Sequence, residues 1–216
     1  MLIAGSRPIH SVTSVLCLGA HADDIEIGCG GTLLKLRTLN PALDVTVVVL
    51  SGDEPRLDEA RRSAAALPGD RRVEFIAQSF RDSYFPYCGA ELKDCFNQLA
   101  RGRRPDVIFT HARHDLHQDH RLVSDLTWNA FRDHLILEYE IPKYDGDLGS
   151  PNTFVALDRA TCDRKIEHLR SCFPTQADKP WFSSETFIAT LRLRGVECRS
   201  PDGYAEGFYA RKLILA

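Results

Sequence analysis

Residues 19–31 read GAHADDIEIGCGG, and the chain is organised around this stretch. The apolar run before it, residues 15–18, predicts a buried strand, and the apolar segment after it predicts a helix. Where a strand passes into a helix in an open α/β sheet, ligands bind at the strand ends. His21, Asp23 and Asp24 place three ionisable side chains there, and their burial is unfavourable unless a partner compensates the charge. A divalent metal would do so, with His21 and Asp24 as ligands and Asp23 as a free carboxylate beside it.

Strands and helices alternate along the rest of the chain, which predicts an α/β fold with one mostly parallel sheet and helices on both faces. With 216 residues, 44% of them hydrophobic, the chain can bury one core. We therefore expect a single domain over 1–216, in which 153–216 form a C-terminal extension of helices and strands. Strands are expected at about 12–20, 44–50, 73–77, 106–110, 135–141, 153–156 and 207–215, and helices at about 31–38, 56–67, 91–100, 119–132, 159–172 and 183–194.

The composition excludes several classes of function. The 27 basic and 30 acidic residues give a formal charge of −3, and the arginine pairs are scattered, so we expect no nucleic-acid binding. The longest aliphatic run, residues 45–50, is too short to cross a bilayer, and the N-terminus lacks the pattern of a signal peptide. Seven cysteines without a CxxC pair predict reduced, mostly buried thiols and a cytoplasmic protein. The sequence leaves the oligomeric state open, with a homo-oligomer among the alternatives.

A second group of candidate ligands follows the strand expected at 106–110. Four of the eight histidines fall within residues 111–120, at the same edge of the sheet as His21. A hydrolytic zinc site has three protein ligands and a water, so one of these histidines would complete the set begun by His21 and Asp24. A second, unligated histidine would hydrogen-bond the developing oxyanion and protonate the leaving amine, with Asp119 beside it to fix its tautomer and keep it cationic.

Other interpretations of these motifs exist. Residues 28–31 (GCGG) resemble a dinucleotide-binding loop, but they do not match GxGxxG, and charged side chains stand where a pyrophosphate requires backbone N–H groups. Close packing of the first helix on the sheet explains the glycines better. A histidine-rich loop is often simply solvated. The metal interpretation is favoured because both clusters follow strands and are predicted on one rim of one sheet.

Residues 20–26 (AHADDIE) and 30–33 (GGTL), together with 117–120 (HQDH), resemble the motifs of the LmbE-like, or PIG-L, family of zinc-dependent de-N-acetylases. That family carries an AHPDDxE…GGTL motif and a later HxDH-type motif. Weaker similarities follow in the family's order, so that the resemblance spans nearly the whole chain. They are SGDE at 51–54, RLDE at 56–59 and YAEGF at 204–208.

The resemblance implies a fold, a cofactor and a reaction. The fold is Rossmann-like, a three-layer α/β/α arrangement, and the cofactor is one Zn²⁺ per chain. The reaction is hydrolysis of an N-acyl group, usually acetyl, from an amino sugar or its conjugate. The roles carried over are His21, Asp24 and His120 as zinc ligands, Asp23 as general base, His117 as the group that steadies the oxyanion and acts as acid, Asp119 as its partner, and Arg56 and Asp82 as groups that hold sugar hydroxyls.

The chain departs from the family's pattern at two places. Alanine stands at position 22 instead of proline, which removes stiffness but allows the same backbone geometry. The residues at 113–116 (RHDL) replace the usual ones, and this brings His111 and His114 in as alternative ligands or substrate contacts. We expect His111 to cap the strand end and His114 to face solvent or the mouth of the site. Glu26 matches a motif position, and we expect it to support a ligand or a backbone N–H group.

Three further features have two interpretations each. The polar loop 143–152 is either a substrate loop or a simple turn. Trp181 is either a platform for a sugar ring or an anchor for the C-terminal helices, and we favour the anchor. Glu206 either reaches the site or pairs with Arg211 or another arginine.

The expected function is that of a zinc-dependent hydrolase that removes an N-acetyl group from a small N-acetylated sugar or an N-acetylglucosaminyl conjugate. The alternatives are a metal-dependent amidase acting on a thiol conjugate, a phosphoesterase and a non-catalytic sugar-binding protein. A phosphoesterase usually requires two metals and more carboxylate ligands than these motifs offer. A non-catalytic role is disfavoured because the candidate base, both types of ligand and the second histidine are all present.

Overall fold

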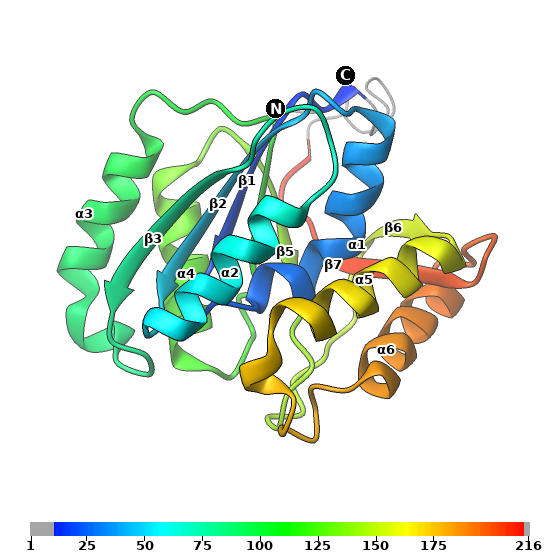
Figure 1. Ribbon diagram of the computed structural model, residues 1–216. Coiled ribbons are helices and arrows are strands. Elements are labelled where there is room, and N and C mark those ends of the chain that lie inside the picture. The colour runs from blue at the N-terminus through cyan, green and yellow to red at the C-terminus, as the bar shows by residue number, and fades with distance from the viewer. Residues whose placement is uncertain (1–10, 214–216) are drawn as a thin grey trace.

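The computed structural model describes residues 11–213, and these form one seven-stranded sheet in the order β3-β2-β1-β4-β5-β7-β6 (Figure 1). The first five strands run parallel, and β7 pairs antiparallel with both β5 and β6. The mostly parallel α/β architecture predicted from the alternating pattern is confirmed. The strands are β1 (Ser14–Gly19), β2 (Asp44–Ser51), β3 (Glu74–Phe80), β4 (Val107–His111), β5 (Leu135–Tyr139), β6 (Thr153–Leu157) and β7 (Tyr204–Tyr209).

Helices cover both faces of this sheet and give three layers. The helices α1, α2, α5 and α6 pack on one face, and α3 and α4 pack on the other (Figure 1). Side chains of β1 alternate between two cores, with Val15 in the first and Leu16 in the second, as expected for a strand buried on both faces. The helices are α1 (Asp24–Leu39), α2 (Glu54–Ala66), α3 (Gly89–Ala100), α4 (Gln118–Ala130), α5 (Arg159–Cys172) and α6 (Ser184–Glu197), with short 3₁₀ turns η2 (Phe85–Cys88) and η3 (Pro174–Gln176). Within residues 11–213, no helix has the length and apolar character needed to cross a bilayer.

Helix α1 begins at Asp24, seven residues earlier than the predicted start at residue 31. The predicted start was wrong, but the close packing of this helix on the sheet that the glycines predicted is confirmed. A side chain at Gly28 would place its Cβ 2.2 Å from the Tyr139 ring, and one at Gly31 would meet Leu157 at 2.6 Å. The glycines therefore lie inside the helix and allow it to pack closely on β5 and β6.

The last strand, β7, spans 204–209. The predicted strand, 207–215, started three residues late, and its last two residues lie outside the described residues. Glu206 is only 3% exposed, and its carboxylate accepts hydrogen bonds from the backbone N–H groups of Gly31 and Thr32 in α1. It also pairs with Lys165 at 2.6 Å, and it does not pair with Arg211 as considered from the sequence. Burial of this charge is tolerated because three donors satisfy it.

Candidate active site

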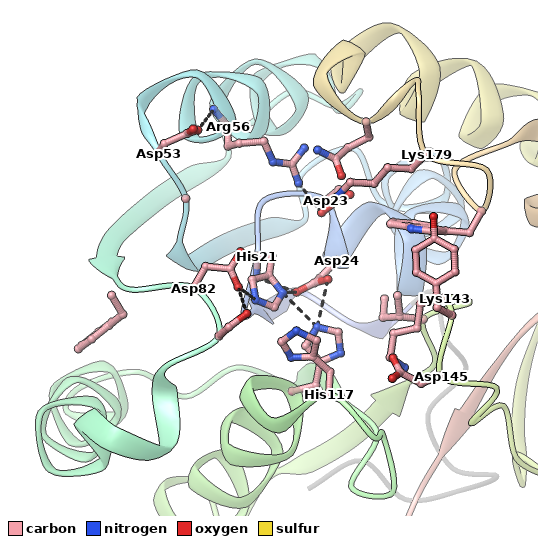
Figure 2. A pocket seen from close by; sticks show the side chains of 18 of the residues that line it. His21, Asp23, Asp24, Asp53, Arg56, Asp82, His117, Lys143, Asp145 and Lys179 are labelled. Atoms are coloured by element: carbon pink, nitrogen blue, oxygen red, sulfur yellow. Dashed lines mark hydrogen bonds and ion pairs between the residues drawn. The ribbon is translucent and has the colours of Figure 1, made fainter.

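The loops at the carboxyl ends of the strands enclose a pocket of ≈ 650 Å³ (Figure 2). This is the edge at which open α/β sheets bind ligands. Seven of the eight residues named from the sequence line it, and the eighth, Asp119, is fully buried. The seven are His21, Asp23 and Asp24 from the turn between β1 and α1 and its first helical residue, Arg56 from α2, Asp82 from the loop after β3, and His117 and His120 from the start of α4.

His21, Asp24 and His120 present their donor atoms to one another. His21 Nδ1 lies 3.3 Å from Asp24 Oδ2 and 3.1 Å from His120 Nε2, and His120 Nε2 lies 3.6 Å from Asp24 Oδ1. Tetrahedral zinc with bonds of 2.0–2.1 Å would separate its ligand atoms by about 3.3 Å. The two nitrogens are near this spacing, and each has one oxygen of Asp24 near it as well, so these residues fit the metal.

Carboxylates lie behind the two histidines, buried in Asp115 and Asp119 and exposed in Asp82, and they favour one tautomer of each ring. Asp115 Oδ2 accepts from His120 Nδ1 at 2.8 Å, which leaves the lone pair of His120 on Nε2. His21 Nε2 lies 3.1 Å from Asp82 Oδ1 and 3.4 Å from Asp119 Oδ2, which leaves the lone pair of His21 on Nδ1. Metal-ligating histidines commonly have such carboxylate partners behind them. Both lone pairs are thus directed at the position that a metal would take.

The charges at this position favour a cation. Burial opposes protonation of His21, but the carboxylates of Asp24, Asp119 and Asp82 outweigh it, and the pKa of His21 is raised well above its ordinary value. Burial likewise opposes ionisation of Asp24, but His120, His111 and His21 outweigh it and hold the pKa of Asp24 well below its usual range. A proton on His21 therefore occupies the charge position that a metal ion would fill.

In the described part of the chain, three other sets of donors lie close enough to bind an ion, and all share a residue with the first set. They are Asp24, His111 and His120; His21, His117 and His120; and His21, Asp82 and Asp119. The His111 Nε2 atom accepts a hydrogen bond from the N–H of Ala20 at 3.0 Å, so its lone pair is already used. His111 is fully buried and stacks on the His120 ring at 3.9 Å, so it supports the site from behind.

Asp23 is buried beside the three donors but points its carboxylate elsewhere. Its Oδ1 accepts from Arg56 Nη2 at 2.7 Å, whereas Oδ2 is buried and has no hydrogen-bond partner among residues 11–213. Burial raises the pKa of Asp23 above its ordinary value, although the Arg56 guanidinium opposes that shift. A buried carboxylate oxygen without a partner is unfavourable, and a reacting group that donates a proton would satisfy it.

The expected pairing of Asp119 with His117 is not found, which corrects the role given to Asp119. Its carboxylate accepts from the backbone N–H groups of Ser83 and Phe85, at 2.7 and 3.1 Å, and lies behind His21. His117 is the N-cap of α4, and its Nδ1 accepts from the N–H of Asp119 at 3.3 Å. Burial, with His21 nearby, lowers the pKa of His117. The lowered pKa favours the neutral form of His117, with its hydrogen on Nε2 because Nδ1 accepts, over the cationic form expected from the sequence.

The sequence assigned no role to Asp115, and it gave Lys143 only as part of the loop with two interpretations. Asp115 holds His120, and the Lys143 ammonium lies 3.0 Å from Asp115 and 2.5 Å from Asp147, which ties the loop after β5 to the metal position. The spacing of Asp115 within the histidine cluster was a usable signal for it. Gln176 and Lys179 carry no local pattern. Gln176, Lys179 and Trp181 line the same pocket from the C-terminal part of the chain.

His114 lies apart from the candidate ligands. It is exposed and contacts the Tyr209 ring at 4.6 Å, and it lines a separate, open pocket of ≈ 340 Å³. Glu26 is buried and bonds to Ser63, and burial raises its pKa to about 7. Trp181 both lines the pocket and packs against the core, so its two interpretations are not exclusive.

Three known proteins are similar to this chain over at least half of its length. The diacetylchitobiose deacetylase of Thermococcus kodakarensis is 31% identical over 134 residues, which cover 54% of this chain and 48% of that protein. The chain thus spans about half the length of this relative. The solved structure of N,N'-diacetylchitobiose deacetylase from Pyrococcus horikoshii has a TM-score of 0.73 at 22% identity, over 95% of this chain and 86% of that one. GalB, the 4-carboxy-2-hydroxymuconate hydratase of Pseudomonas putida KT2440, has a TM-score of 0.66 at 19% identity, over 94% and 98%.

These structural similarities, at identities below 25%, show a shared fold, and that fold carries both a deacetylase and a hydratase. The sequence evidence is more specific. Residues 16–131 match the PIG-L family, described as GlcNAc-PI de-N-acetylase, and this segment holds every residue of the candidate metal and base positions. The chain belongs to the PIG-L family.

Proposed function

We propose that this protein is a zinc-dependent hydrolase that removes the N-acetyl group from a small N-acetylated sugar or sugar conjugate. The observation that supports this most directly is the buried Asp23 Oδ2, which has no partner among the described residues and lies next to three donors near zinc spacing. His21, Asp24 and His120 would hold the metal. When bound there, zinc would lower the pKa of a water and polarise the amide carbonyl.

Asp23 would act as the general base. Its Oδ2 accepts a proton from the attacking water while Oδ1 stays hydrogen-bonded to Arg56. The water oxygen forms a bond to the acyl carbon, and the carbonyl oxygen becomes an oxyanion. Collapse of this species breaks the C–N bond and releases acetate, and the nitrogen needs a proton to leave as an amine. Asp23, now protonated, can supply it.

His117 would stabilise the oxyanion by donating from Nε2–H. The hydrogen bond from the Asp119 N–H to His117 Nδ1 fixes this tautomer. A neutral imidazole is a weak acid, so we assign the proton delivery to Asp23 and keep His117 as a hydrogen-bond donor. This revises the acid role that the family resemblance implied for His117.

The pocket wall is suited to a polar, ring-shaped substrate. Arg56 and Asp82 place charged hydrogen-bonding groups beside the metal position, and Trp181 adds a partly exposed aromatic surface. Relatives named for diacetylchitobiose support an N-acetylated amino sugar as the substrate class. The fold also occurs in a hydratase, but the site described here lacks nothing that amide hydrolysis needs.

The protein's surroundings belong to the same proposal. All seven cysteines are free, which supports the reducing cytoplasmic environment that we propose, although only three of them are buried where the sequence predicted mostly buried thiols. We retain one zinc ion per chain and a small-molecule substrate as the expected partners.

The test measures zinc content of the purified protein and acetate release from N-acetylglucosamine, diacetylchitobiose and a GlcNAc-inositol conjugate. We expect about one zinc per chain and acetate release from at least one compound. Asp23→Asn should lower kcat by about 10²- to 10⁴-fold while the zinc content is retained. Acetate release by Asp23→Asn at the wild-type rate would refute the base assignment. A zinc-loaded protein that releases no acetate from any of the three compounds would refute the proposed function.

A further inference from the structure

Arg56 is held from both sides. Its Nη2 donates to Asp23 Oδ1 at 2.7 Å, and its Nη1 donates to Glu59 Oε2 at 3.1 Å and to Thr175 Oγ1 at 3.2 Å. Arg56 and Glu59 lie one turn apart in α2, and Figure 2 shows the Arg56 side chain reaching from that helix toward Asp23. The guanidinium therefore has a single orientation, set by three partners from three parts of the chain.

Glu59 and Thr175 also bind each other. Glu59 Oε1 accepts from the Thr175 N–H at 2.9 Å, and Glu59 Oε2 accepts from the Thr175 hydroxyl at 2.6 Å. Glu59 is 1% exposed, so water does not compete for its oxygens. Thr175 belongs to η3, outside the segment 16–131 that matches the family, and its neighbour Gln176 lines the pocket. Thr175, in the C-terminal part of the chain, is thus linked to the candidate base by two contacts, one between Thr175 and Arg56 and one between Arg56 and Asp23.

Stability alone does not account for this arrangement. Two buried carboxylates, Asp23 and Glu59, share one guanidinium, so the group carries a net negative charge away from water. Removing such charges from water is unfavourable, and well-packed apolar residues often give equal or greater stability. What the charged group supplies is a fixed geometry. Asp23 Oδ1 is fully engaged, and Oδ2 is left as the free oxygen.

We propose that Glu59 and Thr175 are positioning residues that fix Arg56 and, through it, the Asp23 carboxylate for the hydrolysis. This inference rests on the proposed function, in which Asp23 takes the proton of the attacking water. Neither residue touches the reacting atoms. Small displacements of a catalytic group reduce rates strongly, by about 100-fold for about 1 Å.

The kinetic test uses Glu59→Gln, Thr175→Val and Thr175→Ser. In Glu59→Gln, the side chain keeps its size and its contact with the Thr175 N–H, but it is uncharged and cannot form an ion pair with Arg56. We expect Glu59→Gln and Thr175→Val to lower kcat by about 10- to 100-fold and to change KM less. Thr175→Ser keeps the hydroxyl and should stay within about twofold of wild type. The matched control is Thr190→Val, which removes a part-buried hydroxyl that bonds to Thr186 O in α6, and it should leave kcat unchanged.

A double variant separates positioning from other roles. In an Arg56→Lys background, which loses the planar guanidinium, adding Glu59→Gln should lower kcat by less than about threefold. A further loss as large as that seen in the wild-type background would overturn the proposal, because Glu59 would then act without Arg56. Wild-type kcat in well-folded Glu59→Gln and Thr175→Val would overturn it as well.

A second readout does not depend on activity. In the ¹⁵N NMR spectrum of the wild-type protein, the Arg56 guanidinium should show resolved Nη–H signals because its rotation is restricted. These signals should merge in Glu59→Gln and Thr175→Val but not in Thr190→Val. Equal restriction in all four proteins would overturn the proposal even if the wild-type protein deacetylated none of the three compounds. Failure of the proposed function and failure of the positioning role can therefore be told apart.

Discussion

His21 Nδ1 lies 3.1 Å from His120 Nε2, although 99 residues separate the two in the chain. The parallel pairing of β1 with β4 brings them together, because each histidine follows the carboxyl end of its strand. With the carboxylates behind the two rings, the lone pairs of both nitrogens face each other unless a proton or another cation lies between them. A cation between them resolves the contact, and this makes metal affinity the first property to measure.

Asp115→Asn should weaken zinc binding by about 10- to 100-fold, because the carboxylate that orients His120 and increases its basicity is lost. Isothermal titration of zinc against a competing chelator measures this. Asp145→Asn is the matched control, since Asp145 lines the same pocket but is exposed, and its zinc affinity should stay within about twofold of wild type. Equal affinities for Asp115→Asn and wild type would show that His120 is not a ligand held by Asp115.

His117→Ala should lower kcat by about 10²- to 10³-fold, because the Nε2–H donor to the oxyanion is removed. Zinc affinity should change by less than about threefold, since His21, Asp24 and His120 remain. Chelator competition and steady-state kinetics on the same preparation give both values. A loss of zinc affinity like that of His120→Ala would instead place His117 in the ligand set, as its closeness to His21 and His120 also allows.

Gly28→Ala should destabilise the fold by about 1–3 kcal/mol, because the added methyl would lie 2.2 Å from the rigid Tyr139 ring. Gly30→Ala, two residues away in the same helix, meets its nearest neighbours at 3.8 Å and should increase stability by up to about 1 kcal/mol through helix propensity. Urea denaturation of both variants gives the comparison. Equal midpoints would mean that α1 does not pack on β5 through Gly28.

The ion pair of Glu74 with Arg103 predicts a small dependence of stability on pH. Hydrogen bonds from Arg103 hold the pKa of Glu74 below its ordinary value of 4.5. The contribution is therefore present above that value and is lost as the pH falls through the lower pKa of the folded protein. Both side chains are partly exposed, so we expect less than about 1 kcal/mol. The difference in unfolding free energy between wild type and Glu74→Gln should shrink from pH 7 to pH 3, and a constant difference would contradict this.

Local sequence patterns predicted the order of strands and helices, because β-branched runs and periodic apolar residues report burial directly. They also brought His21, Asp24 and His120 to one rim, because parallel strands share the edge at which they end. The start of α1 was missed because glycine has a low helix propensity. Here the glycines are helical because the helix packs closely on the sheet. Its neighbours in the packing, Tyr139 and Leu157, lie more than 100 residues away in the chain.

The contacts that hold the site residues in place were harder to predict. Asp119 stands next to His120 in the sequence, yet its carboxylate turns to the backbone at Ser83 and Phe85 and lies behind His21. Thr175 reaches Glu59 across 116 residues. Such contacts depend on how loops from different strands pack together, and no local sequence pattern predicts that packing.

The buried pair of Lys165 and Glu206 has a consequence for how the chain is divided. Lys165 donates to the carbonyl of Ile27, and Glu206 accepts from the N–H of Gly31, one helical turn further on in α1. Two residues beyond the family-matched segment therefore complete the backbone hydrogen bonding of the helix that starts at the candidate ligand Asp24. A fragment that ended at residue 131 would lack both of these hydrogen-bonding partners of α1. A chimera that takes its C-terminal part from a relative would need a cation at position 165 and a carboxylate at position 206 to keep the conformation of the first motif.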